Sequence, residues 1–523
     1  MLKKIENIYF VFIFFLTTIL VFLSRQLQIN FVKKYENIFY VYNEPVFTNP
    51  DSYLYFSKIK KILLQPTINF QNYFNDEFLV SLYLILINIF RTLNLTELAL
   101  VSTPYIIVLV FWSIYLFFSS FINKYAALFI SLISCLSNVF LTRSSSLSFD
   151  TDPFNIFFLF LLLFILSLYL NTDLNRKKFY LISISFILTN LIFIFHYPKT
   201  IFGIIFIFIL VPILLTNNQK ILDNFIVCLI FISSIIYFYP ENIILSSFNL
   251  FNLYSDSNNI ETNHQISISN TVMELKTYSL SEIEMFLFYE SFSGIIILFS
   301  ILGILLFFFQ KKNKIILFLP FIFFSFLTLT NGIRFLIFCA PFLYFGLFYF
   351  FIFFLKIIKK KYFIKLENFS KIFIFFFVIF IWKYFFYNCS NFVFNCKFKY
   401  PIEPYFNTKL VKGLIKLNES DNNYNVISSL DFGYLIDYYT TSEFELHPGD
   451  AFHKKKYKFF YSNLKLPENL NNLPTRFWDK SDNENYVFLS YDFIDWWPTI
   501  ANMYAKESEG ISQILKFTLN RFF

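Results

Sequence analysis

Long apolar runs recur along this chain from residue 8 to residue 387, and they constrain the fold more than any other feature. A helix needs about 20 apolar residues to cross the hydrocarbon core of a bilayer. The 523-residue chain is 57% hydrophobic and only 15% charged, whereas about 25% of the residues of a soluble domain are charged. The sequence therefore predicts a polytopic α-helical membrane protein.

The apolar runs divide into eleven expected spans. No small-residue cleavage site follows the first run, so we expect an uncleaved helix rather than a signal peptide. The expected spans are residues 8–25, 97–121, 126–142, 153–170, 178–195, 200–216, 221–239, 291–309, 313–331, 334–357 and 371–387.

Basic residues cluster in the short loops between these runs, which accounts for the net charge of +8 without a nucleic-acid partner. Short cytoplasmic loops carry an excess of lysine and arginine. All the clusters fall on one side if the N-terminus is cytoplasmic, so we expect a multi-pass protein of the inner (plasma) membrane with that orientation. The clusters are Lys3–Lys4, Lys124, Arg176–Lys178, Lys311–Lys314 and Lys359–Lys361.

Four segments then face the extracytoplasmic, periplasmic side. Two are long loops at 26–96 and 240–290, one is the short loop 143–152, and the last is the polar C-terminal part 388–523. The run 424–430 alternates and precedes a turn, which predicts a strand followed by a helix. We therefore expect a transmembrane catalytic domain (1–387) and a mixed α/β periplasmic domain (388–523). Whether Cys389 and Cys396 pair stays open.

Charged residues stand at helix ends on this same side. Asp150 and Asp152 open the fourth expected span. Helix capping explains one aspartate there, but not two in a loop that also carries Arg143. Alone, Asp51 is typical of a turn, Glu274 of a surface loop, and Arg334 of a side chain that reaches the interface. Together, carboxylates favour Mg²⁺ or Mn²⁺, and a nearby arginine favours a pyrophosphate.

These residues carry a resemblance to the catalytic subunit of oligosaccharyltransferase, in its bacterial single-subunit form, which has a GT-C-like fold. The family has an aspartate in its first external loop, a paired acidic motif at its fourth helix, a Thr-x-x-Glu motif in a later external loop, and a Trp-Trp-Asp-Tyr-Gly motif. The matching positions here are Asp51, Asp150-Thr-Asp152, Thr271-Val-Met-Glu274 and Ser429-Leu-Asp-Phe-Gly433.

The resemblance implies transfer of a glycan from a lipid-pyrophosphate carrier to an asparagine of an acceptor protein, with inversion and a bound Mn²⁺ or Mg²⁺. It implies as partners a lipid-linked oligosaccharide, an acceptor protein or peptide and membrane lipid, but no nucleic acid, and we expect a monomer. By this resemblance the metal ligands are Asp51, Asp150, Asp152 and Glu274, the catalytic residues Asp51, Asp150 and Glu274, the donor-binding residues Arg143, Tyr197 and Arg334, and the acceptor-binding residues Asp431 and Trp496.

The chain also departs from the family pattern. Ser429 and Leu430 stand where the family has its tryptophan pair, and Phe286 stands where some bacterial members have an arginine that reads the acceptor. Trp496 ends a run that matches a second acceptor-contacting motif. The family usually has more spans than the eleven expected here.

Two other functions remain open. A membrane glycosyltransferase with a polyprenyl-phosphate donor and a lipid, sugar or hydroxyl acceptor would explain the acidic first loop, but not the Asp431-Phe-Gly433 match. A transporter or a non-catalytic scaffold is the second alternative. Transporters place ionisable residues at mid-membrane, whereas here the acids stand at the outer edge of spans that are almost free of acidic residues.

Overall fold

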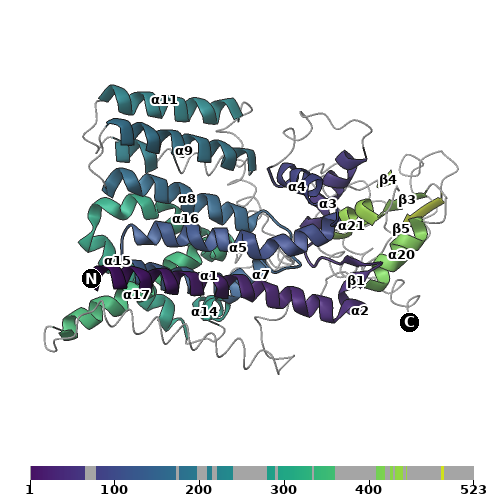
Figure 1. Ribbon diagram of the computed structural model, residues 1–523, viewed down its shortest axis with the longest axis horizontal. Helices are drawn as coiled ribbons and strands as arrows, with labels where there is room; N and C mark the ends of the chain where they lie inside the picture. The colour runs from purple at the N-terminus through teal and green to yellow at the C-terminus, as the bar shows by residue number, and fades with distance from the viewer. Residues whose placement is uncertain are drawn as a thin grey trace, which may run out of the picture.

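The computed structural model is a layered assembly of long helices with shorter elements gathered at one end (Figure 1). The N-terminus lies at the opposite end (Figure 1). The described residues are 2–64, 78–171, 176–196, 206, 209–214, 221–238, 279–288, 293–331, 335–359, 408–418, 424–427, 430–439, 443–444 and 484–487.

The long elements follow the apolar runs. They are α1 (Leu2–Lys34), α5 (Leu95–Ser119), α6 (Lys124–Leu136), α7 (Asn138–Arg143), α8 (Asp152–Asn171), α9 (Arg176–His196), α11 (Ile221–Phe238), α15 (Ile295–Gln310), α16 (Leu319–Asn331) and α17 (Leu336–Lys359). In the described part of the chain, five helices (α1, α5, α8, α9 and α17) are long and apolar enough to cross a membrane. Shorter apolar helices accompany them. This is a membrane protein, and the count of eleven spans stays a prediction.

Three elements differ from their expected spans. Helix α1 continues nine residues beyond the expected end at residue 25. Arg25 does not end the helix, because its side chain is buried within the protein. The expected span 126–142 is broken at Ser137, whose extended backbone (ψ 152°) separates α6 from α7. The expected span 313–331 begins as a 3₁₀ turn, η3 (Lys312–Phe318). The expected span 371–387 lies outside the described residues.

Helices α15 and α17 cross at two glycines. A Cβ added to Gly303 would lie 1.8 Å from the carbonyl oxygen of Gly346, and one added to Gly346 would lie 2.2 Å from the carbonyl oxygen of Ser300. Small residues let membrane helices approach until their backbones touch. The chain has only nine glycines, and two of them make this contact.

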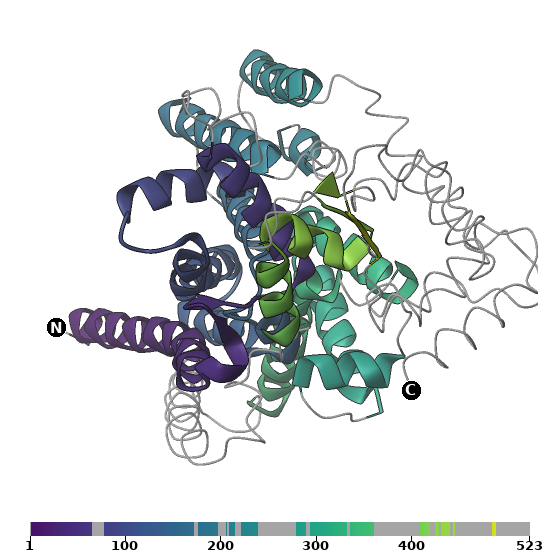
Figure 2. The same ribbon diagram turned by 90° about the vertical axis from the view of Figure 1, so that its right-hand side faces the viewer.

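The elements at the other end come from two distant parts of the sequence. From the first external segment come α2 (Glu36–Phe39), the antiparallel hairpin of β1 (Tyr40–Val41) and β2 (Glu44–Pro45), α3 (Pro50–Leu63) and α4 (Phe78–Ile89). From the C-terminal part come α20 (Thr408–Asn418), β3 (Tyr424–Ile427), α21 (Leu430–Tyr439), β4 (Glu443–Phe444) and β5 (Glu484–Val487). Figure 2 looks onto this end, with α20 and α21 in front of the helix bundle.

The three C-terminal strands form a parallel sheet in the order β4-β3-β5. The sequence predicted a strand followed by a helix here, and β3 and α21 confirm it. Helix α21 connects two parallel neighbours, as a crossover helix does. Its residues Leu435, Ile436, Tyr438 and Tyr439 are buried, and the two tyrosines lie against α3. Whether 388–523 forms a separate domain stays a prediction.

We expect Gly303→Ala to destabilise the protein by about 1–3 kcal/mol, because the added methyl group forces α15 and α17 apart. The matched control is Gly413→Ala in α20, where an added Cβ meets nothing within 4 Å. That change should be neutral or stabilising by up to about 1 kcal/mol. Thermal unfolding in detergent compares the two variants, and equal melting temperatures would contradict the close contact.

Glu44, in the hairpin, supports a pH-dependent prediction. Burial raises the pKa of its carboxyl, against the Lys60 ammonium and the Tyr438 hydroxyl, which lower it. Because this pKa is higher in the folded than in the unfolded chain, the carboxyl stabilises the fold only at low pH, and this contribution is lost as the pH rises above 4.5. Glu44→Gln should therefore melt higher than wild type at neutral pH but not under acidic conditions. A lower melting temperature at neutral pH would mean that attraction to Lys60 dominates.

Candidate active site

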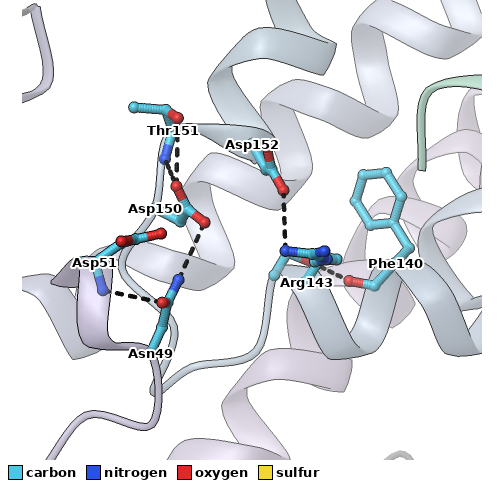
Figure 3. Close-up of polar contacts among 8 residues, drawn as sticks. Asn49, Asp51, Phe140, Arg143, Asp150, Thr151 and Asp152 are labelled. Atoms are coloured by element: carbon cyan, nitrogen blue, oxygen red, sulfur yellow. Dashed lines mark hydrogen bonds and ion pairs between the residues drawn. The ribbon is translucent and has the colours of Figure 1, made fainter. Parts of the chain in front are cut away.

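Asn49 joins the first external segment to the loop that precedes α8. It is the N-cap of α3: its side-chain oxygen accepts a hydrogen bond from the Asp51 backbone N–H (3.0 Å). Its side-chain amide donates to Oδ2 of Asp150 (3.0 Å), 101 residues later in the chain. Pro50 occupies the first helical position, which suits proline because it lacks an N–H. One asparagine thereby holds both aspartates (Figure 3).

The two carboxylates have different surroundings. Oδ1 of Asp150 accepts hydrogen bonds from the Thr151 backbone N–H (2.6 Å) and hydroxyl (3.3 Å), and its Oδ2 accepts from Asn49. Asp150 is partly buried, whereas Asp51 is exposed. In Figure 3 the Asp51 carboxylate lies beside Asn49 and Asp150. The site therefore presents one fixed and one accessible carboxylate.

Asp152 turns to a different partner. Its Oδ2 lies 3.9 Å from Nη1 of Arg143, and the two side chains are 21% and 20% exposed. Figure 3 shows this pair apart from the group around Asn49. An ion pair this exposed contributes only about 0–1 kcal/mol, so its main effect is to orient both side chains. The structure thus pairs an expected metal ligand with an expected donor-binding residue.

The loop between α7 and α8 is held from the side of the first external segment. The Thr48 backbone N–H and hydroxyl both donate to the Leu147 carbonyl, at 2.9 and 3.0 Å. The Phe149 N–H donates to the Ser52 hydroxyl (2.9 Å). With the bond from Asn49, these contacts fix the end of the loop from Leu147 to Asp150.

Arg25 of α1 holds the same loop from the other side. It is fully buried, and it donates to the Ser144 carbonyl from Nε (2.8 Å) and to the Ser144 hydroxyl from Nη2 (2.7 Å). The carbonyls of Cys135 and Phe140 lie 3.5 Å from Nη2. These carbonyls belong to the C-terminal ends of α6 and α7, which carry partial negative charge. Two helix ends therefore help to compensate the buried positive charge.

Gln28, one turn further along α1, extends this contact. Its side-chain oxygen accepts hydrogen bonds from the Ser146 backbone N–H (3.0 Å) and hydroxyl (3.1 Å). The Ser146 hydroxyl also lies within hydrogen-bond distance of the Arg25 carbonyl (3.1 Å). The loop therefore begins against α1 and ends against α3.

His196 ends α9 beneath the turn between the two acidic residues. It is fully buried, and its Nε2 lies 3.4 Å from the Thr151 carbonyl oxygen. Its ring packs against Phe78, Phe154 and Phe158, at centroid distances of 5.4–5.7 Å. Tyr197, an expected donor-binding residue, follows directly but lies outside the described residues.

Four expected site residues lie outside the described part of the chain: Tyr197, Glu274, Arg334 and Trp496. Asp431 lies in the first turn of α21, where only its backbone is described. Within the described ranges, no group of three or more His, Cys, Asp or Glu side chains could hold a metal ion. The two carboxylates at Asn49 supply part of the expected ligand set, and the expected third, Glu274, is not described.

The segment after Glu274 is described from residue 279. Helix α14 (Leu280–Phe288) carries Glu284, a fully buried carboxylate that accepts hydrogen bonds from the backbone N–H groups of Gly294, Ile296 and Ile297 at 2.6–3.3 Å. The first N–H groups of a helix have no acceptor within that helix, and Glu284 supplies one at the start of α15. Phe286 stands where some bacterial members of the family have an acceptor-reading arginine. It is partly buried and packs against the core. Helix α14 is thereby attached to the bundle.

Sequence reasoning missed Asn49 and Arg25. The run Asn49-Pro50-Asp51 has the composition of a helix start, with an N-cap residue followed by proline, and it could have been found. Arg25 stood at the expected end of the first span, where arginine is ordinary. Only its burial shows that it acts inside the protein.

The fold allows a comparison with known proteins. No family model matches the chain, and no curated protein sequence matches it. Solved structures of an oligosaccharyltransferase from Archaeoglobus fulgidus are similar to it. The apo form has a TM-score of 0.64 at 14% identity, over 96% of this chain and 72% of that one.

Two further structures of that archaeal protein are also similar. Its complex with an inhibitory peptide and a dolichol-phosphate has a TM-score of 0.60 at 15% identity, over 92% of this chain and 69% of that one. Its complex with Zn and sulfate has a TM-score of 0.54 at 16% identity, over 90% and 67%. The chain therefore has the GT-C-like fold of a membrane oligosaccharyltransferase, and at such identities the likeness shows the fold alone.

We expect Arg25→Met to lower the melting temperature strongly, because it leaves the buried Ser144 carbonyl and hydroxyl without their donor. Each unsatisfied group costs about 1–3 kcal/mol. Arg25→Lys keeps the charge but not the planar group, so its melting temperature should lie between those of Arg25→Met and wild type. Arg91→Met is the control, since Arg91 is exposed and donates only to the Asn88 carbonyl among the bonds described (3.3 Å). An Arg25→Met protein that melts like wild type would contradict this role.

Proposed function

We propose that this protein transfers a glycan from a lipid-pyrophosphate carrier to the side chain of an acceptor asparagine. The observation that carries the proposal is the meeting of Asp51 with Asp150 through Asn49, at the end of a bundle that has an oligosaccharyltransferase fold. One archaeal structure holds an inhibitory peptide and a dolichol-phosphate, and another is tethered to an acceptor peptide, which is consistent with a lipid-linked donor and a peptide acceptor.

A divalent cation fits the oxygens at this site. Asp51 is exposed, and Asp150 is held by Asn49 and Thr151 in a fixed orientation. Carboxylate oxygens suit Mn²⁺ or Mg²⁺, and the archaeal relative in fold was solved with Zn. When bound, such a cation polarises substrate oxygens and orients the reactants. We propose Asp51, Asp150 and Glu274 as its ligands. Asp152 is the fourth proposed ligand, and its Oδ2 also lies 3.9 Å from Nη1 of Arg143.

The nucleophile is an amide nitrogen, whose lone pair is delocalised. We propose that Asp51 and Glu274 accept hydrogen bonds from its N–H groups, which reduces this delocalisation. A nitrogen–carbon bond forms at the anomeric carbon with inversion, the bond to the pyrophosphate oxygen breaks, and the amide releases one proton. Arg334 stabilises the charge on the departing pyrophosphate, with Tyr197 and Arg143 as further donor-binding residues.

Acceptor recognition is the less complete part of the proposal. We propose that Asp431, in the first turn of α21, binds the hydroxyl residue two positions after the acceptor asparagine, and that Trp496 lines the same site. Because Ser429 and Leu430 replace the family's tryptophan pair, a second function is a polyprenyl-phosphate-dependent glycosyltransferase with a lipid, sugar or hydroxyl acceptor. The bacterial single-subunit class, the inner membrane, the periplasmic active site and the monomeric state belong to the proposal too.

We expect the purified protein, reconstituted with a lipid-linked oligosaccharide, Mn²⁺ and an Asn-X-Thr peptide, to add a glycan mass to the peptide. A chelator should abolish the reaction. Asp150→Ala and Glu274→Gln should each abolish transfer without unfolding the protein, because each removes a carboxylate proposed to bind the cation. Asp150→Ala also loses the hydrogen bonds from Asn49 and Thr151, so it should melt somewhat lower than wild type. Mass spectrometry of the peptide reads the outcome.

The outcomes separate the two functions. The second function is favoured if the peptide stays unmodified and the donor is consumed only when a lipid or sugar acceptor is added. Near-normal peptide transfer by both variants would overturn the assignment of the site. The control is Glu282→Gln, a partly exposed residue near the start of α14 whose carboxylate accepts hydrogen bonds from the Ser279 N–H and hydroxyl.

A further inference from the structure

Helices α3 and α21, which lie far apart in the sequence, pack against each other (Figure 2). Aromatic rings make this contact. Tyr53 of α3 is fully buried, and its ring centroid lies 5.6 Å from that of Tyr438 and 5.8 Å from that of Tyr439. Phe56, one turn further along α3, lies 5.8 Å from Tyr438. This apolar contact brings α21 to α3, but flat rings leave its exact position along α3 poorly defined.

Lys60 supplies a directional contact at the same place. Its ammonium donates to the Tyr438 carbonyl oxygen and also lies 5.0 Å from the centroid of the Tyr438 ring. Tyr438 is the penultimate residue of α21. The last carbonyls of a helix have no partner within it and carry partial negative charge, so a cation there is favourable. Cation and ring attract each other as well.

Glu44 completes the contact from the hairpin. Its carboxylate is hydrogen-bonded to the Tyr438 hydroxyl, and it interacts electrostatically with Lys60. One tyrosine of α21 is thus held at its carbonyl, its ring face and its hydroxyl by the first external segment. These three polar contacts add direction to the packing of the rings, because each requires Tyr438 at one place along α3.

The two helices that meet here also carry proposed site residues. Asp51 lies in the first turn of α3, nine residues before Lys60, which is about 13 Å along a helix. Asp431 lies in the first turn of α21, seven residues before Tyr438, or about 10 Å. A shift of α21 on α3 therefore moves Asp431 relative to Asp51 without disturbing the bonds between Asn49 and Asp150.

We propose that Lys60 is a positioning residue for the acceptor, holding α21 on α3 so that Asp431 keeps a fixed distance from Asp51. The inference rests on the proposed function, since it takes Asp431 to bind the acceptor. Misplacing a binding group by about 1 Å can reduce a rate by on the order of a hundredfold. Because the donor-binding residues come from other elements, the loss of Lys60 affects the acceptor and spares the donor.

The test measures steady-state glycan transfer by the full-length protein to an Asn-X-Thr peptide. For Lys60→Met we expect the KM for the peptide to rise about tenfold, with the KM for the lipid-linked donor and the melting temperature close to wild type. Lys60→Arg should restore most of the peptide KM, because a guanidinium also donates to a carbonyl and stacks on a ring. The matched control is Lys61→Met, an exposed lysine next in the chain, which should behave like wild type.

Each other outcome overturns a defined claim. An unchanged peptide KM for Lys60→Met, or equal rises in the peptide and donor KM values, would overturn the role of Lys60 and leave the proposed function standing. Wild-type protein that transfers no glycan would overturn the proposed function, and this inference with it. If Lys60→Met does not fold, Lys60→Gln removes the charge and shortens the side chain by one atom, and a peptide KM unchanged in that variant would also overturn the proposal.

Discussion

The geometry of the candidate site depends on one buried guanidinium. A charge in an apolar interior is unfavourable unless hydrogen bonds and opposite charge compensate it. Arg25 meets the Ser144 carbonyl and hydroxyl and the carbonyl-rich ends of α6 and α7. The break of the expected third span into α6 and α7 places two helix ends, rather than one, near this charge. After the break, α7 leads into the loop that carries Asp150.

The loop that follows is polar because non-helical backbone near a membrane must find its hydrogen-bond partners within the protein. Ser144 and Ser146 are bound by α1, and the backbone at Leu147 and Phe149 by Thr48 and Ser52. The hydroxyls of Ser144 and Ser146 thus bond to groups within the protein. The same contacts hold the loop that brings Asp150 to Asn49, where the candidate site lies.

Hydropathy predicted α5, α8, α9 and α17 to within a few residues, because a long apolar run is a local signal that needs no partner. The strand-to-helix prediction at β3 and α21 succeeded because alternation followed by a turn is also a local signal. Asp51 and Asp150 were chosen from their positions at helix ends, and the structure joins them. Arg25, the break at Ser137 and the pairing of Asp152 with Arg143 were missed, because each depends on contacts that a linear pattern does not encode. The roles of Glu274, Arg334, Tyr197 and Trp496 stay predictions.

Helix α3 takes part in three contacts at this end of the molecule. Its N-terminus meets Asp150 through Asn49, its middle packs on the rings of α21, and Lys60 near its C-terminus binds the end of α21. A helix of 14 residues is too short to cross a membrane but stiff enough to transmit position over about 20 Å. Because one rigid element carries both contacts, the distance between Asp51, a proposed metal ligand, and α21, the proposed acceptor-binding helix, is set by covalent geometry within α3 rather than by loop packing. A loop in its place would leave that distance variable, and an enzyme that must bring an amide nitrogen to an anomeric carbon gains most where that distance does not vary.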